Sequence, residues 1–303
     1  MKLAELSQSN LNHQLQRGLS LQTGSFVVKI KSSIPAVAHG LALLYAEYPI
    51  IEDSFADFHV TISQPSTWRR YFKPQVLFGF EGVSPFSPLP YDQAFPMLEW
   101  GMNWCVTNHA HTYLSIHAAV LEKNGRAVIL AAPPGSGKST LCAGLMTRGW
   151  RLLSDEITLV RLSDGLIEPL PRPVSLKNNS IDVIKQFAPD SVFSPVVHDT
   201  VKGTVAHLKP SSSSVTRAHD VAAPAWIIFP KYVAGSATSL TSVAPSRAMM
   251  QVAENAFNYG LLGQNGFHAL AKLIQSCQSY DFQYSELDQA IALFDQLSLA
   301  VAA

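Results

Sequence analysis

A glycine-rich octapeptide near the middle of the chain, PPGSGKST at residues 133–140, has residue types suited to binding phosphate. A loop of this kind turns several backbone N–H groups toward one point and ends at a helix N-terminus, whose partial positive charge favours anions. The Lys138 ammonium can reach the β and γ phosphates of a nucleotide, and the Ser139 hydroxyl can hold Mg²⁺. The sequence therefore predicts a site for ATP and Mg²⁺, with nucleotide contacts from Pro134, Gly135, Ser136, Gly137, Lys138, Ser139 and Thr140.

The residues on either side of this loop provide the context that a phosphate-binding loop requires. An apolar strand is expected over Ala127–Ala132, and Leu141 and Leu145 begin the apolar stripe of a helix that ends near Gly149. One position departs from the pattern G-x-x-x-x-G-K-[ST], because residue 132 is alanine where the pattern has glycine. The competing interpretation is a Gly/Ser turn with an incidental lysine, and the strand and helix flanks argue against it.

Two adjacent carboxylates, Asp155 and Glu156, follow an expected short strand and begin 17 residues after Lys138. Phosphoryl transfer needs a carboxylate near the metal and a base that orients the attacking hydroxyl, and an acidic pair can divide these tasks. The alternative is a solvated acidic turn, since acidic residues are common in loops.

A resemblance to a known family rests on three stretches: IHAAVL at 116–121, AVILAAPPGSGKSTL at 127–141 and RGWRLLSDE at 148–156. Together they resemble the C-terminal catalytic domain of HPr kinase/phosphorylase, in which a histidine precedes the loop lysine by 21 residues, as His117 precedes Lys138 here. DTVKGTVAHLKP at 199–210 and ENAFNYG at 254–260 are similar to the HPr-kinase-related group called kinase A. The resemblance covers about residues 111 to 300, and it implies a P-loop kinase domain of the HPr kinase type.

The resemblance also implies roles for individual residues. Asp155, with Ser139, would hold Mg²⁺, and Glu156 would orient or deprotonate the acceptor hydroxyl; the reverse assignment stays open because the parent family usually has Asp-Asp here. His117 would lie near the transferring phosphate, unless it is a core histidine on a buried strand. The expected catalytic residues are therefore Asp155, Glu156, His117, Lys138, Arg172 and Lys202.

Arg172 and Lys202 enter this set because the parent family places basic residues opposite the loop, where they stabilise charge on the transferring phosphoryl group. Lys177 is a third candidate for the same role. Prolines 171 and 173 flank Arg172 and stiffen its backbone, which suits a positioned cation. For each of the three, a solvated surface side chain is the alternative. The parent family's full arginine-glycine signature after the acidic pair is absent, so its carrier-protein specificity and reverse phosphorolysis are not carried over.

The elements that must position these residues indicate an α/β protein: a mixed sheet with flanking helices at 111–303, preceded by a β-rich domain at 1–110. Strands are expected at Phe26–Ile30, Phe58–Ile62 and Val76–Phe80, a helix at Gln93–Thr107, and a strand at Tyr113–Leu121 turning at 123–125. Later strands are expected at 152–153, 157–162 and 225–229. Later helices are expected at Ile181–Phe187, Arg247–Tyr259, Phe267–Cys277 and Leu287–Leu297.

Composition excludes several function classes. The chain has 303 residues, and 22 Lys and Arg balance 22 Asp and Glu. We therefore do not expect it to bind nucleic acid through an excess of positive charge. No signal peptide and no apolar run of membrane-spanning length is apparent, which favours a cytoplasmic protein that does not insert into a membrane. Cys105, Cys142 and Cys277 are expected to be buried thiols. His109 and His111 lack a third ligand at metal spacing, so no zinc site is expected.

These observations favour a Mg²⁺-dependent kinase that transfers the γ-phosphoryl group of ATP to a hydroxyl, with serine of a peptide or protein as the expected acceptor. A small-molecule kinase acting on a sugar or metabolite is one alternative, and a switch that binds and slowly hydrolyses ATP is another. The N-terminal domain is a candidate recognition module. The resemblance adds a small PqqD-like protein as a partner, and assembly into a homo-oligomer is left open.

Overall fold

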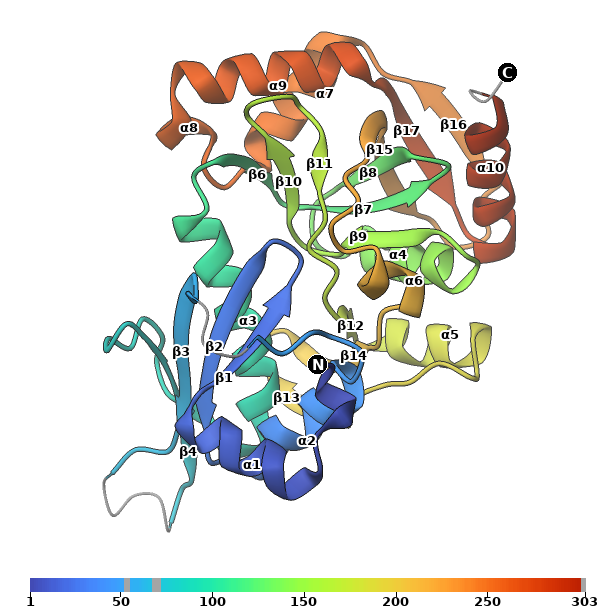
Figure 1. Cartoon of the computed structure of the whole chain (residues 1–303). Helices are drawn as coiled ribbons and strands as arrows, with labels where there is room; N and C mark the ends of the chain where they lie inside the picture. Colours follow the sequence, from blue (N-terminus) through green and yellow to red (C-terminus); the bar gives the residue numbers. More distant parts are fainter. Residues whose placement is uncertain (52–54, 67–71, 301–303) are drawn as a thin grey trace.

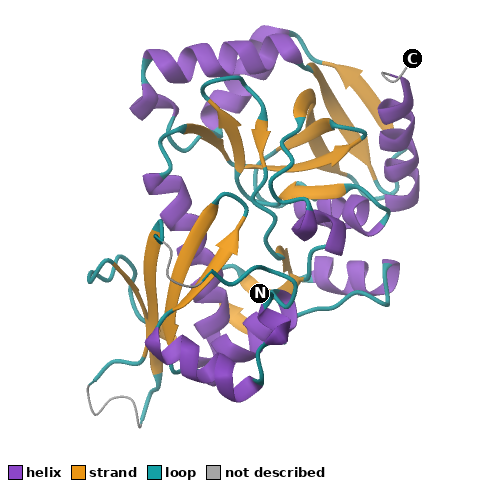
Figure 2. Ribbon diagram, in the orientation of Figure 1, coloured by secondary structure: helices purple, strands orange, loops and turns teal. Residues whose placement is uncertain are grey.

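The computed structural model describes residues 1–51, 55–66 and 72–300. Helices and both parallel and antiparallel strands alternate along the chain, which confirms the predicted α/β class. In Figure 1, the described part of residues 1–110, called here the N-terminal half, lies below, and the six-stranded sheet of the later residues, in the C-terminal half, lies above. Figure 2 shows helices against the sheets in both halves.

The N-terminal half is built on one mixed sheet with the strand order β1-β2-β3-β4-β5. Its strands are β1 (Leu19–Thr23), β2 (Phe26–Ser32), β3 (Phe58–Ser63), β4 (Gln75–Phe80) and β5 (Leu89–Pro90). β2 and β3 are parallel, and the other neighbours are antiparallel. The strands predicted from Phe26, Phe58 and Val76 onward are confirmed.

Helices pack on this sheet and supply much of its core. They are η1 (Leu3–Glu5), α1 (Gln8–Arg17), α2 (Pro35–Leu44), η3 (Tyr91–Gln93) and α3 (Ala94–His109). The predicted helix at Gln93–Thr107 is confirmed as α3, whereas α1 and α2 were not predicted. Gly40 of α2 permits a close approach to α3, because a Cβ at this position would lie 2.2 Å from the Phe95 ring.

The C-terminal half contains a second mixed sheet with the order β16-β17-β15-β8-β7-β9. Its strands are β7 (Ala118–Lys123), β8 (Arg126–Ala131), β9 (Arg151–Ser154), β15 (Ala223–Tyr232), β16 (Ser239–Ser242) and β17 (Gln278–Tyr284). β15 is parallel to β8 and β17, and the remaining pairs are antiparallel. The strand predicted at 225–229 lies within β15.

Both faces of this sheet are covered, because its strands alternate between two apolar clusters. α4 (Lys138–Thr147) and α10 (Leu287–Ala300) cover one face. α7 (Pro245–Glu254), α8 (Tyr259–Leu262) and α9 (Gln264–Ser276) lie toward the other (Figure 1). The helices predicted at 267–277 and 287–297 are confirmed. The helix predicted at Arg247–Tyr259 ends sooner, at Glu254.

A tight hairpin joins β7 to β8, as predicted from the sequence Lys-Asn-Gly. Asn124 and Gly125 both have positive φ, at 57° and 78°, and Lys123 pairs with Arg126. Two central residues with positive φ are typical of the turn that matches the twist of antiparallel strands. The hairpin fixes β8, which leads directly into the glycine-rich loop.

The single strand predicted at Tyr113–Leu121 is wrong, because the chain changes sheets at His117. β6 (Tyr113–Ile116) belongs to a separate sheet with β10 (Thr158–Arg161) and β11 (Ile167–Glu168), whereas β7 joins the central sheet. The His117 N–H donates to the carbonyl oxygen of Asn255 at 2.7 Å. The backbone between the two strands is therefore held by a segment far along the chain.

The two halves share apolar core and hydrogen bonds. Ile157, Leu159 and Leu170 pack in the cluster that includes the N-terminal sheet, and the Tyr48 hydroxyl donates to Pro171 O at 2.8 Å. A small sheet lies nearby and has the strand order β12 (Val174–Lys177), β14 (Gly203–Leu208), β13 (Val197–Thr200). In the sequence, α5 (Asn179–Phe187) follows β12, and α6 (Ser212–Thr216) follows β14. α5 confirms the helix predicted at 181–187.

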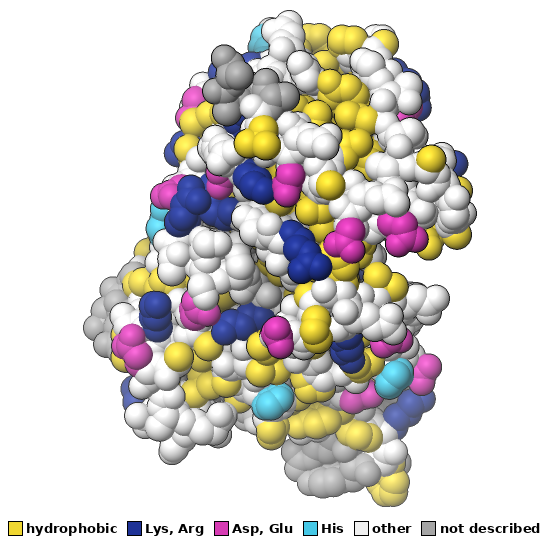
Figure 3. Space-filling view, turned by 90° about the vertical axis from the view of Figure 1, so that its right-hand side faces the viewer, with side chains coloured by type: hydrophobic (Ala, Val, Ile, Leu, Met, Phe, Trp, Pro, Cys, Tyr) yellow, Lys and Arg dark blue, Asp and Glu magenta, His cyan; other side chains and the backbone are white. Residues whose placement is uncertain are grey.

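The helices, the surface charges and the cysteines can be compared with what the composition predicts. No helix in the described part of the chain has the length and apolar character needed to cross a bilayer. On the face shown in Figure 3, Lys and Arg side chains are interspersed with Asp and Glu. Cys105 and Cys142 are buried, as predicted, and Cys277 is half-buried.

Candidate functional site

The glycine-rich loop connects β8 to α4, in the strand-loop-helix order predicted. Gly135 and Gly137 have φ of 84° and 89°, a region that disfavours side chains, and Gly137 is the residue at the N-terminal cap of α4. The loop is fixed from outside: the Tyr284 hydroxyl donates to Gly137 O at 3.0 Å, and the Tyr232 N–H donates to Ser136 O at 2.9 Å. The N-terminus of α4 therefore faces the site with its backbone conformation held.

Ala132, which departs from the sequence pattern, is accommodated without strain. It is buried directly after β8, and it is not among the described non-glycine residues with positive φ. The conformational freedom of glycine is therefore not needed at this position.

Lys138 is the first residue of α4, and its charge is buried at the end of the glycine-rich loop. Its side chain is buried, and the ammonium has no hydrogen-bond partner within the described residues. Burial lowers the pKa of Lys138, and the nearby Asp155 and Glu156 carboxylates only partly oppose that effect. An unpaired buried cation is costly, so its placement favours an anionic ligand at this point.

Asp155 follows β9 and faces the loop. Its Oδ2 accepts from the Ser175 N–H at 3.0 Å and from the Ser139 hydroxyl at 3.3 Å, while its buried Oδ1 has no partner within the described residues. Burial and the neighbouring Glu156 charge raise the pKa of Asp155 to about 6. The oxygens of Ser139 and Asp155 are the kind of donor pair that Mg²⁺ prefers, so these residues fit the predicted metal site.

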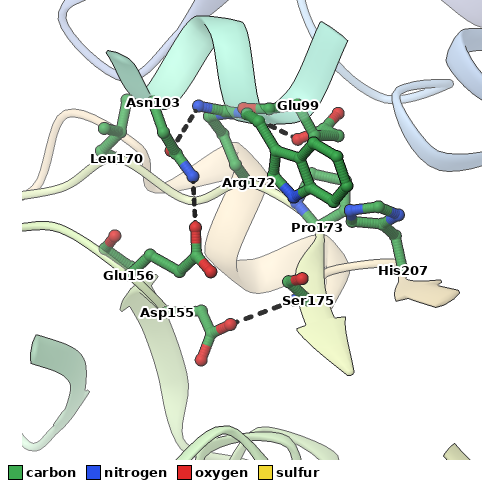
Figure 4. A pocket seen from close by; sticks show the side chains of 11 residues that line it. Glu99, Asn103, Asp155, Glu156, Leu170, Arg172, Pro173, Ser175 and His207 are labelled. Atoms are coloured by element: carbon green, nitrogen blue, oxygen red, sulfur yellow. Dashed lines mark hydrogen bonds and ion pairs between the residues drawn. The ribbon is translucent and has the colours of Figure 1, made fainter. Parts of the chain in front are cut away.

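Glu156 faces a different direction from Asp155 (Figure 4). Its Oε1 lies 3.6 Å from Lys177 Nζ, and its Oε2 accepts from Asn103 Nδ2. Burial raises the pKa of Glu156, but the charges of Lys202, Lys177 and Lys138 outweigh it, so the pKa is lowered. The adjacent carboxylates are therefore placed in different electrostatic environments.

His117 lies at the junction between β6 and β7. Burial lowers the pKa of His117 to about 4, and the Lys138 charge adds to the effect. The ring is therefore neutral near pH 7. Its centroid is 5.7 Å from that of Phe257.

One cavity of about 890 Å³ brings most of the predicted residues together. The loop lines it along residues 133–140, and His117, Glu156 and Lys177 line it as well. Residues from α5, from the end of β17 and from the start of α10 form more of the wall: Val183, Gln186, Phe187, Tyr284, Ser285, Glu286, Leu287 and Asp288. A cavity of this size, with an anion-binding loop beside apolar side chains, can hold a nucleotide.

Arg172 lies in a neighbouring, smaller cavity, which Figure 4 shows. Its guanidinium is buried and forms an ion pair with Glu99 of α3, at 2.6 Å between Nη2 and Oε2. Burial lowers the pKa of Arg172, but the Glu99 carboxylate outweighs it and the net pKa is raised. Among the cations predicted from sequence, Arg172 is thus engaged with a carboxylate, whereas Lys177 lines the large cavity.

Lys202 lies at the turn between β13 and β14. Its ammonium is 5.0 Å from the centroid of the Trp100 ring on α3. Burial lowers the pKa of Lys202, and the Glu156 carboxylate opposes that effect. Lys202 therefore adds positive potential at Glu156 without lining the large cavity.

Several residues at the site were missed by sequence reasoning. Glu99, Trp100 and Asn103 come from α3, and Tyr232 and Tyr284 come from the strands that hold the loop. The available signal was a polar pair four residues apart, Glu99 and Asn103, among the apolar residues of the first three turns of α3. Across the described residues, no group of three or more His, Cys, Asp or Glu side chains could hold a metal ion.

His207 supplies a test of the buried cluster beside the site (Figure 4). It is buried on β14 with neither ring nitrogen hydrogen-bonded within the described residues, and burial lowers its pKa. Below about pH 6.5 the unfolded chain binds a proton that the folded chain does not, so stability falls as pH falls. In the His207→Phe variant, we expect the slope of unfolding free energy against pH between 7 and 5 to decrease, by at most about 1.4 kcal/mol per pH unit.

Urea unfolding at several pH values measures this slope, and His198→Phe is the control, because His198 is an exposed histidine of the same small sheet. An unchanged slope in His207→Phe would show that the imidazole is protonated equally in both states.

Comparison with known proteins gives similarities to a family and to solved structures. Residues 94–176 match the family described as SynChlorMet cassette protein ScmC. No curated protein matches the chain. Among solved structures, the chain is similar to the Hpr(Ser) kinase/phosphatase from Coxiella burnetii, with 11% identity over 62% of this chain and 99% of that chain, and a TM-score of 0.30. This structural similarity to an HPr kinase/phosphatase is distant.

Proposed function

We propose that this protein is a kinase that transfers the γ-phosphoryl group of ATP to a hydroxyl, with serine of a peptide or protein as the acceptor. The observation that carries the proposal is the buried Lys138 ammonium at the N-terminus of α4, which has no hydrogen-bond partner among the described residues and lies near the Asp155 and Glu156 carboxylates. A bound polyphosphate would satisfy the cation, and the carboxylates supply the groups that phosphoryl transfer requires.

The first task of the site is to bind and orient the nucleotide. The loop N–H groups and Lys138 bind phosphate oxygens, and Ser139 with Asp155 would hold Mg²⁺. The ion would supply positive charge to the phosphate oxygens when bound. The apolar side chains Val183, Phe187 and Leu287 offer a surface for the nucleoside.

The second task is to activate the acceptor. Glu156 lines the cavity and its pKa is lowered, so it is ionised near neutral pH and can accept a hydrogen bond from the acceptor hydroxyl. Lys177, 3.6 Å from Glu156, can stabilise negative charge as it develops on the phosphoryl group. His117 is neutral and can donate or accept a hydrogen bond at the same wall of the cavity.

The acceptor is the part of the proposal that most needs direct identification. Incubation of the protein with γ-labelled ATP and a cell lysate should place label in a peptide or protein, and the linkage should be the acid-stable ester of a serine. Label found only in small metabolites would replace the peptide acceptor with a sugar or metabolite. A small PqqD-like partner would be recognised as a protein that increases the rate of labelling.

Metal removal gives a direct test of the Ser139 and Asp155 pair. Phosphoryl transfer should stop in EDTA, and Mg²⁺ or Mn²⁺ should restore it, because hydroxyl and carboxylate oxygens suit these hard ions. The initial rate of ADP formation, measured before and after each addition, checks this. A full rate in the presence of the chelator would contradict the proposed metal site.

A further inference from the structure

A chain of hydrogen bonds links Glu156 to the N-terminal half of the molecule (Figure 4). Glu99 and Asn103 are four residues apart on α3, so they lie on one face of the helix. Asn103 Nδ2 donates to Glu156 Oε2, and Asn103 Oδ1 accepts from Arg172 Nη1 at 2.7 Å. Arg172 in turn binds the carboxylate of Glu99.

The chemistry of Arg172 determines which way the Asn103 amide is turned. A guanidinium only donates hydrogen bonds, so it must face the amide oxygen, and the amide NH₂ must then face Glu156. Glu156 is thus presented with a donor, which suits its ionised form. A reversed amide would place two donors together and two oxygens together.

The end of this hydrogen-bond chain away from Glu156, at Arg172 and Glu99, is held by further hydrogen bonds. Arg172 Nη2 also donates to Glu99 O at 2.8 Å, and the Tyr45 hydroxyl donates to Glu99 Oε1 at 2.7 Å. Tyr45, Glu99 and Arg172 are all buried. Few rotamers are therefore open to the groups that hold Asn103.

We propose that Asn103 is a positioning residue, which holds one oxygen of Glu156 so that the other is presented to the cavity and to the acceptor hydroxyl. The inference rests on the kinase function proposed above. It gives the N-terminal half a defined part in catalysis: α3 sets the orientation of the carboxylate, and Tyr45 and Arg172 hold α3 in place through Glu99. A site that depends on geometry in this way loses rate when a supporting contact is removed.

The sharpest variant is Asn103→Asp, which preserves shape and the oxygen facing Arg172 but replaces the donor facing Glu156 with an oxygen. We expect kcat to fall about ten- to hundredfold while KM for ATP stays within about twofold, because the nucleotide contacts are untouched. Asn103→Ala should lower kcat in the same direction without adding charge. Asn108→Asp is the matched control, because it adds the same charge to an exposed site on the same helix and should leave both constants unchanged.

A second measurement reads the contact without any turnover. The double variant Asn103→Asp with Glu156→Gln exchanges donor and acceptor, so the hydrogen bond can form again in reverse. Urea unfolding should show that Asn103→Asp is destabilised and that the double variant recovers most of the loss, while kcat stays low because the base is gone.

The outcomes separate the inference from the proposed function. Unchanged kcat in Asn103→Asp, or strictly additive losses of stability in the double variant, would overturn the positioning role. If the wild-type protein transfers no phosphoryl group to any acceptor, the kinase function and the catalytic role of Asn103 fail together, and recovered stability in the double variant would then establish only the contact.

Discussion

Glu156→Gln is expected to lose turnover by about 10²- to 10⁴-fold while keeping nucleotide affinity close to that of the wild type. Glutamine preserves the size of the side chain and can still contact Asn103, but it cannot accept a proton at neutral pH. Glu156 is directed toward Asn103 and Lys177, whereas Asp155 is directed toward the loop. Steady-state turnover and equilibrium binding of ATP, with and without Mg²⁺, provide the two readouts.

Asp155→Asn is the matched comparison, since it makes the same chemical change one residue away. It should weaken the binding of ATP in the presence of Mg²⁺ as well as turnover, because Asp155 Oδ2 contacts the Ser139 hydroxyl. The reverse pattern would exchange the two roles. Near-wild-type turnover in both variants would show that neither carboxylate takes part in turnover, and it would remove the catalytic core of the kinase proposal.

Lys138→Met is expected to lower ATP affinity by about 30-fold or more and to stabilise the protein without nucleotide. The loss arises because a buried charged hydrogen-bond donor contributes at least about 2 kcal/mol to such a contact. The gain arises because the wild-type ammonium is buried without a hydrogen-bond partner among the described residues, a cost of about 1 kcal/mol or more that methionine avoids.

Thermal unfolding with and without ATP measures both effects in one experiment. The rise in Tm with ATP should be smaller in Lys138→Met than in the wild type, and the Tm without ATP should be higher in Lys138→Met. Lys185→Met, a change on α5 at a lysine that packs over the Phe193 ring, is the control. An equal response to ATP in wild type and Lys138→Met would contradict the assignment of the loop.

Local patterns in the sequence predicted the elements that depend on neighbouring residues. The Asn-Gly turn, the apolar strand β8 and the amphipathic helices α5, α9 and α10 all follow from short-range chemistry. The break at His117 could not be predicted in this way, because β6 and β7 form one apolar run. Asn258 binds the backbone of β6 just before the break: its side chain accepts from the Ser115 N–H at 2.9 Å and donates to Tyr113 O at 2.9 Å. These contacts join residues more than a hundred positions apart.

In the candidate site, too, the features set by neighbouring residues could be predicted and those set by distant contacts could not. Lys138, Ser139 and Asp155 were predicted from spacing around one loop, and the structure places them together. Arg172 was expected to face the phosphates, but its position is set by Glu99, which lies on a helix 73 residues earlier in the chain. The same helix carries Asn103. No spacing rule connects α3 to the acidic pair, so the support of Glu156 could be found only in three dimensions.

The central claim is that the γ-phosphoryl group reaches an acceptor hydroxyl, and a balance of products over time tests it most directly. ADP, free phosphate and esterified phosphate are measured in the same reaction, once with the wild type and once with Glu156→Gln. Each reaction contains the lysate fraction in which the acceptor was identified by labelling. For the wild type we predict that ADP exceeds free phosphate throughout and that the excess equals the phosphate found as ester. For Glu156→Gln we predict that the formation of ADP and of ester falls by the factor given above for turnover. Equal amounts of ADP and free phosphate at every time, with no ester formed, would contradict the kinase account and indicate a protein that only hydrolyses ATP.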